Sequence, residues 1–435
     1  GCFQKACRLT GAFSQTPHIG QSNWDAWAHY HAMMGLYLWH KELQDERLWQ
    51  ALLRMAELFL RTFYTNEGRR LSDLGFPVTN MAPIHIFSLL YQDTGDSRYL
   101  TFAKQVETDM EAPDACPFTA LYKSGREFYQ CPQPRWESLH NVMGLAALYT
   151  CTGEEIYRLT AEHIFYSILK TDVHNTGAFS TEEQAVGQPY TNGKIELCCV
   201  IAYNVLACDI HTRNRTKRLL KAAGAKTVMG SFSPTGRWST YDSPMEGTRC
   251  ANYHSIGFQC RPGSPELNCC SVNAARGIGT LADWAVMEDE DTVYIQYWGT
   301  CSFTTASGLS VSISGDYPAS PHITISLRSS RPVRVALRIP AWSHHTSLTL
   351  NGDIQHPPAG QYWYGDKLWE DTIHLTFDFT PHLLAGEGDY AGKYSLYIGP
   401  VLYGYDLSFP DNLDFDDLPL RERVQAALFQ SVTPR

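Results

Sequence analysis

The stretch SLLYQDTGDSRYLTFA, residues 88–103, decides the fold because it recurs without a gap as AALYTCTGEEIYRLTA at residues 146–161. The alignment places Tyr91 with Tyr149. In both copies, apolar residues at helical spacing stand on either side of a turn that contains Thr-Gly. Repeated helix pairs of this length predict either an α-solenoid or a closed α/α toroid.

The helical spacing extends on both sides of this repeat and ends near residue 290. From residue 291 onward, short runs rich in β-branched and aromatic residues follow a period of two, as in HITISLRSS and RPVRVALRIPAW. This pattern predicts an antiparallel β-sandwich. We therefore expect a helical domain at 1–290, a β-sandwich domain at 291–409 and a C-terminal tail at 410–435.

Composition narrows the class of protein. The 435 residues suffice for two or three domains, and 35 Lys plus Arg stand against 45 Asp plus Glu, a net charge of -10. This balance argues against nucleic acid and against an anionic membrane surface as partners. No apolar run approaches the roughly 20 residues of a membrane span. We expect a soluble protein, in the cytoplasm rather than secreted, and either a monomer or a homodimer.

Two short segments contain the residues best suited to chemistry. Cys269 and Cys270 are adjacent in ELNCCSVNAARG, and Glu196 and Cys198 stand two apart in IELCC. Three thiols and one carboxylate can form a tetrahedral Zn²⁺ site. Adjacent ligands differ from the usual spacing of structural zinc sites, so buried cysteines and a strained vicinal disulfide are alternative interpretations.

These segments resemble a known family. NCCSVNAARG resembles the Cys-Cys-Pro-Pro-Asn-x-x-Arg signature of the glycoside hydrolase family 127 β-L-arabinofuranosidases, and IELCC resembles their Thr-Glu-x-Cys element. The repeated Thr-Gly turns, ALRIPAW, LTLNGD and IGPVLYG follow in the same order as family features. The resemblance implies an (α/α)6 barrel followed by a β-sandwich. It also implies a missing leading segment or an abbreviated barrel, because too few helices precede residue 291.

The resemblance implies specific roles for the clustered residues. Its Zn²⁺ ligands would be Glu196, Cys198, Cys269 and Cys270. Cys269 would also be the nucleophile, since a zinc-bound thiolate can attack an anomeric carbon as a carboxylate does in other retaining glycosidases. For the general acid and base the resemblance favours Glu183, with Glu182 as the second choice. Two solvated loop carboxylates are the alternative interpretation of this pair.

Further residues match positions that contact sugar in the family. These are His31, His140, Tyr241, Asn273 and Arg276, and Asn80 takes the place of a family histidine. For each histidine, a hydrogen-bonded core residue is the alternative. Ser271 and Val272 replace the two prolines of the signature, which predicts a looser turn in front of the thiols.

The resemblance implies a retaining, zinc-dependent exo-glycosidase that acts on terminal β-L-arabinofuranosides of plant-type glycans, with carbohydrate as its partner. A glycosidase for another furanose or for a branched acidic sugar is the first alternative, because Asn80 departs from the family. A non-catalytic zinc or carbohydrate-binding scaffold is the second, since fold alone does not determine function.

Overall fold

The computed structural model describes residues 24–64, 69–112, 114–214, 228, 231–232, 239–244 and 268–403. It divides into two compact units. The first comprises Gly1–Thr227, Ser233–Met245 and Ala251–Ser271, and the second comprises Val228–Phe232, Glu246–Cys250 and Val272–Arg435. The boundary near residue 290 stays a prediction, and the expected tail at 410–435 lies outside the described residues. Within those residues, no helix has both the length and the apolar character needed to cross a membrane.

The first unit is helical, as the sequence predicts. Its described helices are α2 (Asp25–Leu43), α3 (Glu46–Phe63), α4 (Pro77–Asn80), α5 (Pro83–Thr94), α6 (Ser97–Asp109), α7 (Phe118–Lys123), α8 (Trp136–Thr152), α9 (Glu155–Thr171) and α10 (Leu197–Asn214). The helix α12 (Cys269–Ala285) begins in this unit and continues into the second.

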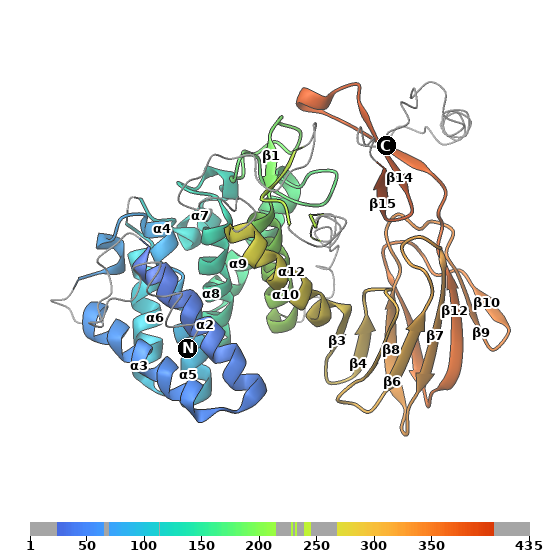
Figure 1. The fold of residues 1–435 in the computed structure, drawn as a ribbon, viewed down its shortest axis with the longest axis horizontal. Coiled ribbons are helices and arrows are strands. Elements are labelled where there is room, and N and C mark those ends of the chain that lie inside the picture. Colours follow the sequence, from blue (N-terminus) through green and yellow to red (C-terminus); the bar gives the residue numbers. More distant parts are fainter. Residues whose placement is uncertain are drawn as a thin grey trace. The chain divides into compact units, whose positions relative to one another are not determined.

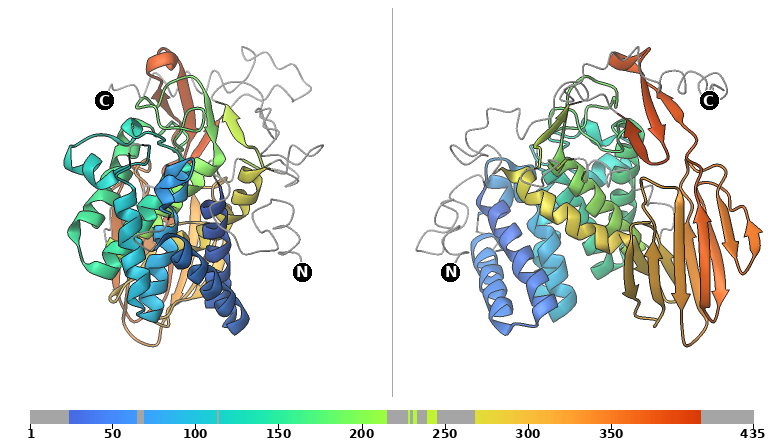
Figure 2. Two further views of the ribbon diagram at one scale, coloured as in Figure 1. Left: turned by 90° about the vertical axis from the view of Figure 1, so that its left-hand side faces the viewer. Right: turned by 45° about the vertical axis from the view of Figure 1, so that its right-hand side comes forward.

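The helices of the first unit form two layers, which can be followed in Figure 1 and Figure 2. Helices α2, α5, α8 and α10 contact one another in that order, and α3, α6 and α9 each pack against the helix that precedes them. Helices α5 and α8 are buried along most of their length, whereas α3 and α6 expose one face. The predicted helix pairs are therefore confirmed, with one member of each pair in a buried row.

The repeat read from the sequence is a repeated turn. Gly95 and Gly153 both have a φ of 69°, and each N–H donates to the carbonyl four residues earlier, at 2.9 and 2.7 Å. This left-handed backbone favours glycine and ends the first helix of each pair. The hydroxyls of Thr94 and Thr152 each accept a 3.1 Å hydrogen bond from the amide two residues later. Two matched sets of local contacts thus produce the same helix–turn–helix unit.

One glycine lets the buried helices α5 and α8 approach closely. A Cβ added at Gly144 of α8 would collide with the Ile84 side chain and would lie 2.9 Å from the backbone nitrogen of His85. We expect Gly144→Ala to lower the free energy of unfolding by about 1–3 kcal/mol, measured by chemical denaturation, because overpacking forces the two helices apart.

The control for this substitution is Gly35 of α2, which is exposed and has nothing within 4 Å of its added Cβ. There, Gly35→Ala should raise the free energy of unfolding by about 0.5–1 kcal/mol, since alanine is the better helix former. A stabilising effect at both positions would contradict the close approach.

The second unit is a β-sandwich. Its described strands are β3 (Val286–Glu288), β4 (Thr292–Ile295), β5 (Cys301–Thr304), β6 (Ser310–Ser314), β7 (His322–Arg328), β8 (Val333–Arg338), β9 (Ser347–Leu350), β10 (Asp353–Gln355), β11 (Tyr362–Lys367), β12 (Glu370–Thr376), β13 (His382–Ala385), β14 (Tyr394–Ile398) and β15 (Val401–Tyr403). They form a six-stranded sheet β10-β9-β12-β7-β6-β5, a four-stranded sheet β11-β8-β4-β3 and a three-stranded sheet β13-β14-β15.

The core of this unit lies between the six-stranded and four-stranded sheets. Ile325 of β7 and Ile373 of β12 in one sheet share a buried cluster with Val293 of β4 and Val335 of β8 in the other. Burial alternates along β7, which is the period-two pattern of a half-buried strand. The predicted antiparallel sandwich is confirmed, except that β4 and β8 pair in parallel.

Candidate active site

The first half of the candidate site lies where a strand runs directly into a helix. Glu196 ends β1 (Lys194–Glu196), and Cys198 lies in the first turn of α10. The strand β1 pairs antiparallel with β2 (Asp242–Pro244), and the amide that follows Glu196 donates a 3.0 Å hydrogen bond to the carbonyl of Tyr241. This short ladder therefore fixes Tyr241 beside the Glu-x-Cys segment.

The second half is the first turn of α12, where Cys269 and Cys270 follow Asn268. The Ser271 amide donates to Oδ1 of Asn268 at 3.0 Å, the Asn268 amide donates to Oγ of Ser271 at 3.0 Å, and this hydroxyl donates to the Asn268 carbonyl at 2.8 Å. Such reciprocal bonds cap a helix N-terminus. The expected loosening of this turn is therefore wrong: hydrogen bonds restrain it in place of the two prolines.

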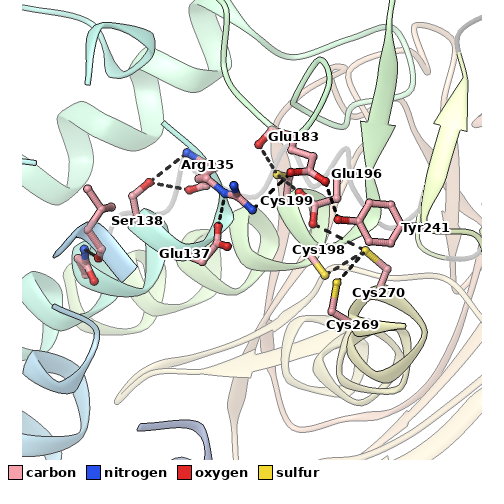
Figure 3. Close-up of polar contacts among 12 residues, drawn as sticks. Arg135, Glu137, Ser138, Glu183, Glu196, Cys198, Cys199, Tyr241, Cys269 and Cys270 are labelled. Atoms are coloured by element: carbon pink, nitrogen blue, oxygen red, sulfur yellow. Dashed lines mark hydrogen bonds and ion pairs between the residues drawn. The ribbon is translucent and has the colours of Figure 1, made fainter. Parts of the chain in front are cut away.

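The two halves bring four predicted residues together, as Figure 3 shows. Four atoms that could bind a metal ion lie within 4.8 Å of one another, one each from Glu196, Cys198, Cys269 and Cys270. The Sγ atom of Cys270 is 3.1 Å from Sγ of Cys198 and 3.8 Å from Oε1 of Glu196. It is 4.0 Å from Sγ of Cys269, about twice the length of an S–S bond, so no vicinal disulfide joins Cys269 and Cys270.

The electrostatics of the cluster distinguish Cys269 from the other thiols. Hydrogen bonds with Cys198 and Cys270 lower the pKa of Cys269 to about 4 and outweigh its burial. Burial raises the pKa of Cys198 and of Cys270 well above the usual range for a thiol. Burial, and then the negative charge of Glu137, raise the pKa of Glu196. The cluster by itself thus concentrates negative charge on the half-buried Cys269.

A divalent metal ion fits this donor set. A tetrahedral zinc site with Zn–S bonds of about 2.3 Å separates its sulfur atoms by about 3.8 Å. The Sγ separations of 3.1 and 4.0 Å in the cluster bracket this value. Three thiols and one carboxylate also match the mixed sulfur and oxygen ligands that Zn²⁺ accepts. A cation would compensate the carboxylate and thiolates that burial otherwise disfavours.

Glu183 lies beside this cluster on a loop with unusual backbone geometry. Ser180, Glu182 and Glu183 have φ values of 110°, 49° and 76°, a region that residues other than glycine rarely occupy. The hydroxyl of Tyr241 donates a 2.6 Å hydrogen bond to Oε1 of Glu183. Glu182 has an exposed side chain, whereas Glu183 is half-buried. The geometry therefore brings Glu183, the preferred of the two carboxylates, together with Tyr241.

Three neighbours of the cluster were not predicted from the sequence. Arg135 donates from Nε to Oε2 of Glu137 at 2.6 Å, and its Nη2 atom is 3.5 Å from Oε2 of Glu183. Cys199, buried next to a predicted ligand, donates its S–H to Oε2 of Glu196 at 3.2 Å. One signal was available, namely two charged residues at the head of a helix that is otherwise apolar, in RWESLHNVMGLAALY.

The two predicted histidines meet in an aromatic cluster between α2 and α8. The ring centroids of His31 and His140 are 5.2 Å apart, and Trp136 lies 5.5 Å from His140. The Tyr30 hydroxyl is 2.8 Å from Nδ1 of His140 and 3.1 Å from Nδ1 of His85. Because one hydroxyl donates only one proton, it donates to one of these rings and accepts from the other.

Three of the predicted sugar contacts remain, namely Asn80, Asn273 and Arg276. The side chain of Asn80 is fully buried and donates from Nδ2 to the carbonyl of Gly75 at 2.8 Å, so it closes the turn before α4. Asn273 and Arg276 lie on α12 beyond Ser271, in the part of the helix that belongs to the second unit. Their roles in the site stay predictions.

Together, the fold and the cluster define a class of protein: a domain of helix pairs that contains a buried thiol–carboxylate group, followed by a β-sandwich. The family model for the β-L-arabinofuranosidase GH127 catalytic domain matches residues 3–283. The model for the GH127 middle domain matches residues 292–380. The chain therefore belongs to glycoside hydrolase family 127, as the sequence motifs indicated.

Individual relatives agree with this assignment. A non-reducing end β-L-arabinofuranosidase of Bifidobacterium longum is 24% identical over 384 residues, which cover 75% of this chain but only 56% of that relative. A solved GH127 β-L-arabinofuranosidase from Geobacillus stearothermophilus T6 has a TM-score of 0.66 at 14% identity, covering 92% of this chain and 68% of its own. A structure described as a glycoside hydrolase reaches 0.69 at 18% identity, covering 91% and 72%. The similarity to these two solved structures shows that the chain shares their fold.

Proposed function

We propose that this protein is a retaining exo-glycosidase that hydrolyses terminal β-L-arabinofuranosides of plant-type glycans. The observation that carries the proposal is the placement of Cys269 in a buried cluster of metal-ligand type, with Tyr241 contacting Glu183 next to it. Family membership and the activity printed for the Bifidobacterium relative support the reaction class and the sugar.

In the first half of the reaction, Cys269 acts as the nucleophile. Bound by Glu196 and the three cysteines, Zn²⁺ would keep the thiols deprotonated at neutral pH. The Cys269 thiolate attacks the anomeric carbon, so that a C–S bond forms while the C–O bond to the aglycone breaks. Glu183 donates its carboxyl proton to the departing oxygen. The product is a thioglycoside on Cys269.

In the second half, the same two residues act in reverse. Glu183, now a carboxylate, accepts a proton from water as the water oxygen bonds to the anomeric carbon. The C–S bond breaks, which regenerates the thiolate of Cys269. Two displacements at one carbon retain its configuration, as in glycosidases that use a carboxylate nucleophile.

The proposed sugar contacts are His31 and His140, as the family resemblance implies. Trp27 and Trp136, whose ring centroids are 5.0 Å apart, pack against both histidines. Asn80 supports a second candidate, in which the substrate is another furanose or a branched acidic sugar. Asn80 takes the position of a family histidine, and its side-chain amide donates to a carbonyl of the turn before α4.

The test is intact mass spectrometry of Glu183→Ala after incubation with an activated nitrophenyl β-L-arabinofuranoside. Loss of the acid/base residue should trap the intermediate, so the protein mass should increase by one pentosyl unit that maps to Cys269. The same incubation with other furanosides distinguishes the second candidate. If the wild type binds Zn²⁺ but cleaves no furanoside, and Glu183→Ala forms no adduct, the protein would instead be a non-catalytic zinc or carbohydrate-binding scaffold.

A further inference from the structure

We propose that Arg135, restrained by Glu137, is a positioning residue that holds the carboxylate of Glu183 in its working orientation. The inference rests on the proposed function, because it concerns how the acid/base residue is held. Figure 3 shows the guanidinium of Arg135 between the carboxylate of Glu137 on one side and those of Glu183 and Glu196 on the other.

Glu183 is contacted on both of its oxygens. Tyr241 donates to Oε1 at 2.6 Å, and the Arg135 guanidinium faces Oε2 at 3.5 Å. The Arg135 and Glu183 side chains are 20% and 19% exposed, so their attraction is less screened than that of a surface pair. Because the backbone of Glu183 has a φ of 76°, its unfavourable conformation needs contacts that hold it. The two side-chain contacts are suited to this task.

Arg135 is itself fixed in place. Two hydrogen bonds restrain its backbone at the start of α8. The Arg135 amide donates to Oγ of Ser138 at 3.2 Å, and the Arg135 carbonyl accepts from the same hydroxyl at 2.6 Å. Glu137 is only 2% exposed and binds Nε of Arg135 at 2.6 Å. A buried carboxylate without a cation is strongly disfavoured, so Glu137 keeps the guanidinium at this point.

Within the part of the chain that the structure describes, Glu183 has one ionic contact, the 3.5 Å approach of Arg135. In a bidentate pair, two N–H donors of one guanidinium bind one carboxylate. Here the Nε donor of Arg135 binds Glu137, and the Nη2 atom faces Glu183. The guanidinium is thus shared between two carboxylates, and its contact with Glu137 fixes where it meets Glu183.

Among the described residues, the charged or titratable groups that face Glu183 are Arg135 at the N-cap of α8, Glu196 of β1 and Tyr241 before β2. The carboxylate of Glu196 repels that of Glu183, whereas Arg135 attracts it. Without the arginine, we expect Glu183 to turn away from the cluster.

The experiment compares two leaving groups on the zinc-loaded enzyme. In Arg135→Met, kcat/KM for methyl β-L-arabinofuranoside, whose leaving oxygen needs a proton, should fall roughly 10- to 100-fold. With an activated nitrophenyl β-L-arabinofuranoside, whose leaving group needs no proton, kcat/KM should change little. Both kcat and KM should fall together, because hydrolysis of the thioglycoside still needs Glu183 as a base. Added azide should restore kcat by replacing water. Arg135→Lys, which keeps the charge without the fork, should recover part of the loss.

Two further variants keep the test decisive. Arg135→Met/Glu137→Gln removes both charges, so it leaves no unpaired buried carboxylate and should show the same selective loss if the single variant folds poorly. Arg98→Met alters an exposed ion pair on α6 and should match wild type. Equal losses on both substrates in the Arg135 variants would overturn the inference and leave the proposed function standing. A wild type inactive on both substrates would overturn the proposed function itself.

Discussion

Replacing Cys269 by serine should lower kcat on a nitrophenyl β-L-arabinofuranoside by about 10⁴-fold or more, because a hydroxyl in place of the thiolate removes the proposed nucleophile. The structure favours this cysteine over its neighbours. It is half-buried, and hydrogen bonds with Cys198 and Cys270 lower its pKa to about 4. The measurement is steady-state turnover, with circular dichroism and zinc content recorded on the same samples.

The matched control is Cys301→Ser, which changes an exposed cysteine of β5 in the second unit. It should leave turnover unchanged. Cys269→Ser should remain folded, and Cys270→Ser should lose zinc because it removes a proposed ligand from the buried centre of the cluster. If Cys269→Ser retained more than a few per cent of wild-type turnover, the thiolate would not be the nucleophile.

Removal of a metal ion bound by the proposed ligands is the second change with a large expected effect. A cation that binds only the folded chain stabilises it by about 4 kcal/mol when present at 1,000 times its Kd. For a domain of this size, we expect a strong chelator to lower Tm by roughly 5–10 °C and added Zn²⁺ to restore it. Differential scanning calorimetry of chelated and reloaded samples measures the change.

The pH dependence of metal binding has a definite sign. Burial raises the pKa of Cys198 and Cys270, so these thiols must release protons when a cation binds. Zinc affinity, measured by competition with a chromophoric chelator, should therefore rise as the pH increases from about 6 to 8. An unchanged Tm after chelation, together with a pH-independent affinity, would show that the cluster does not hold a metal.

Much of the fold was predictable because its signals are local. The turns at Gly95 and Gly153 are determined by residues within five positions of each other, so the repeat could be read directly. The period-two pattern likewise predicted the sandwich strands. The parallel pairing of β4 with β8 was not predictable, since no local pattern specifies which distant strand becomes a neighbour.

The same distinction applies to the candidate site. Glu196-x-Cys198 and Cys269-Cys270 are short motifs, and the resemblance connected them before their distances were known. Arg135 and Glu137 were missed because their significance depends on burial and on a contact with a distant loop. Neither residue type carries a signal by itself, since most arginines and glutamates are solvated.

The site also has a consequence for the order of folding. Cys198 and Cys270 are 72 residues apart in the chain, yet their sulfur atoms are 3.1 Å apart. Closing a loop of that length costs conformational entropy that only a nearly complete tertiary structure repays. The α5–α6 and α8–α9 hairpins can form early from neighbouring segments, but the donor set is assembled only when the loop has closed. Bound metal would therefore report that the helical unit has completed its folding.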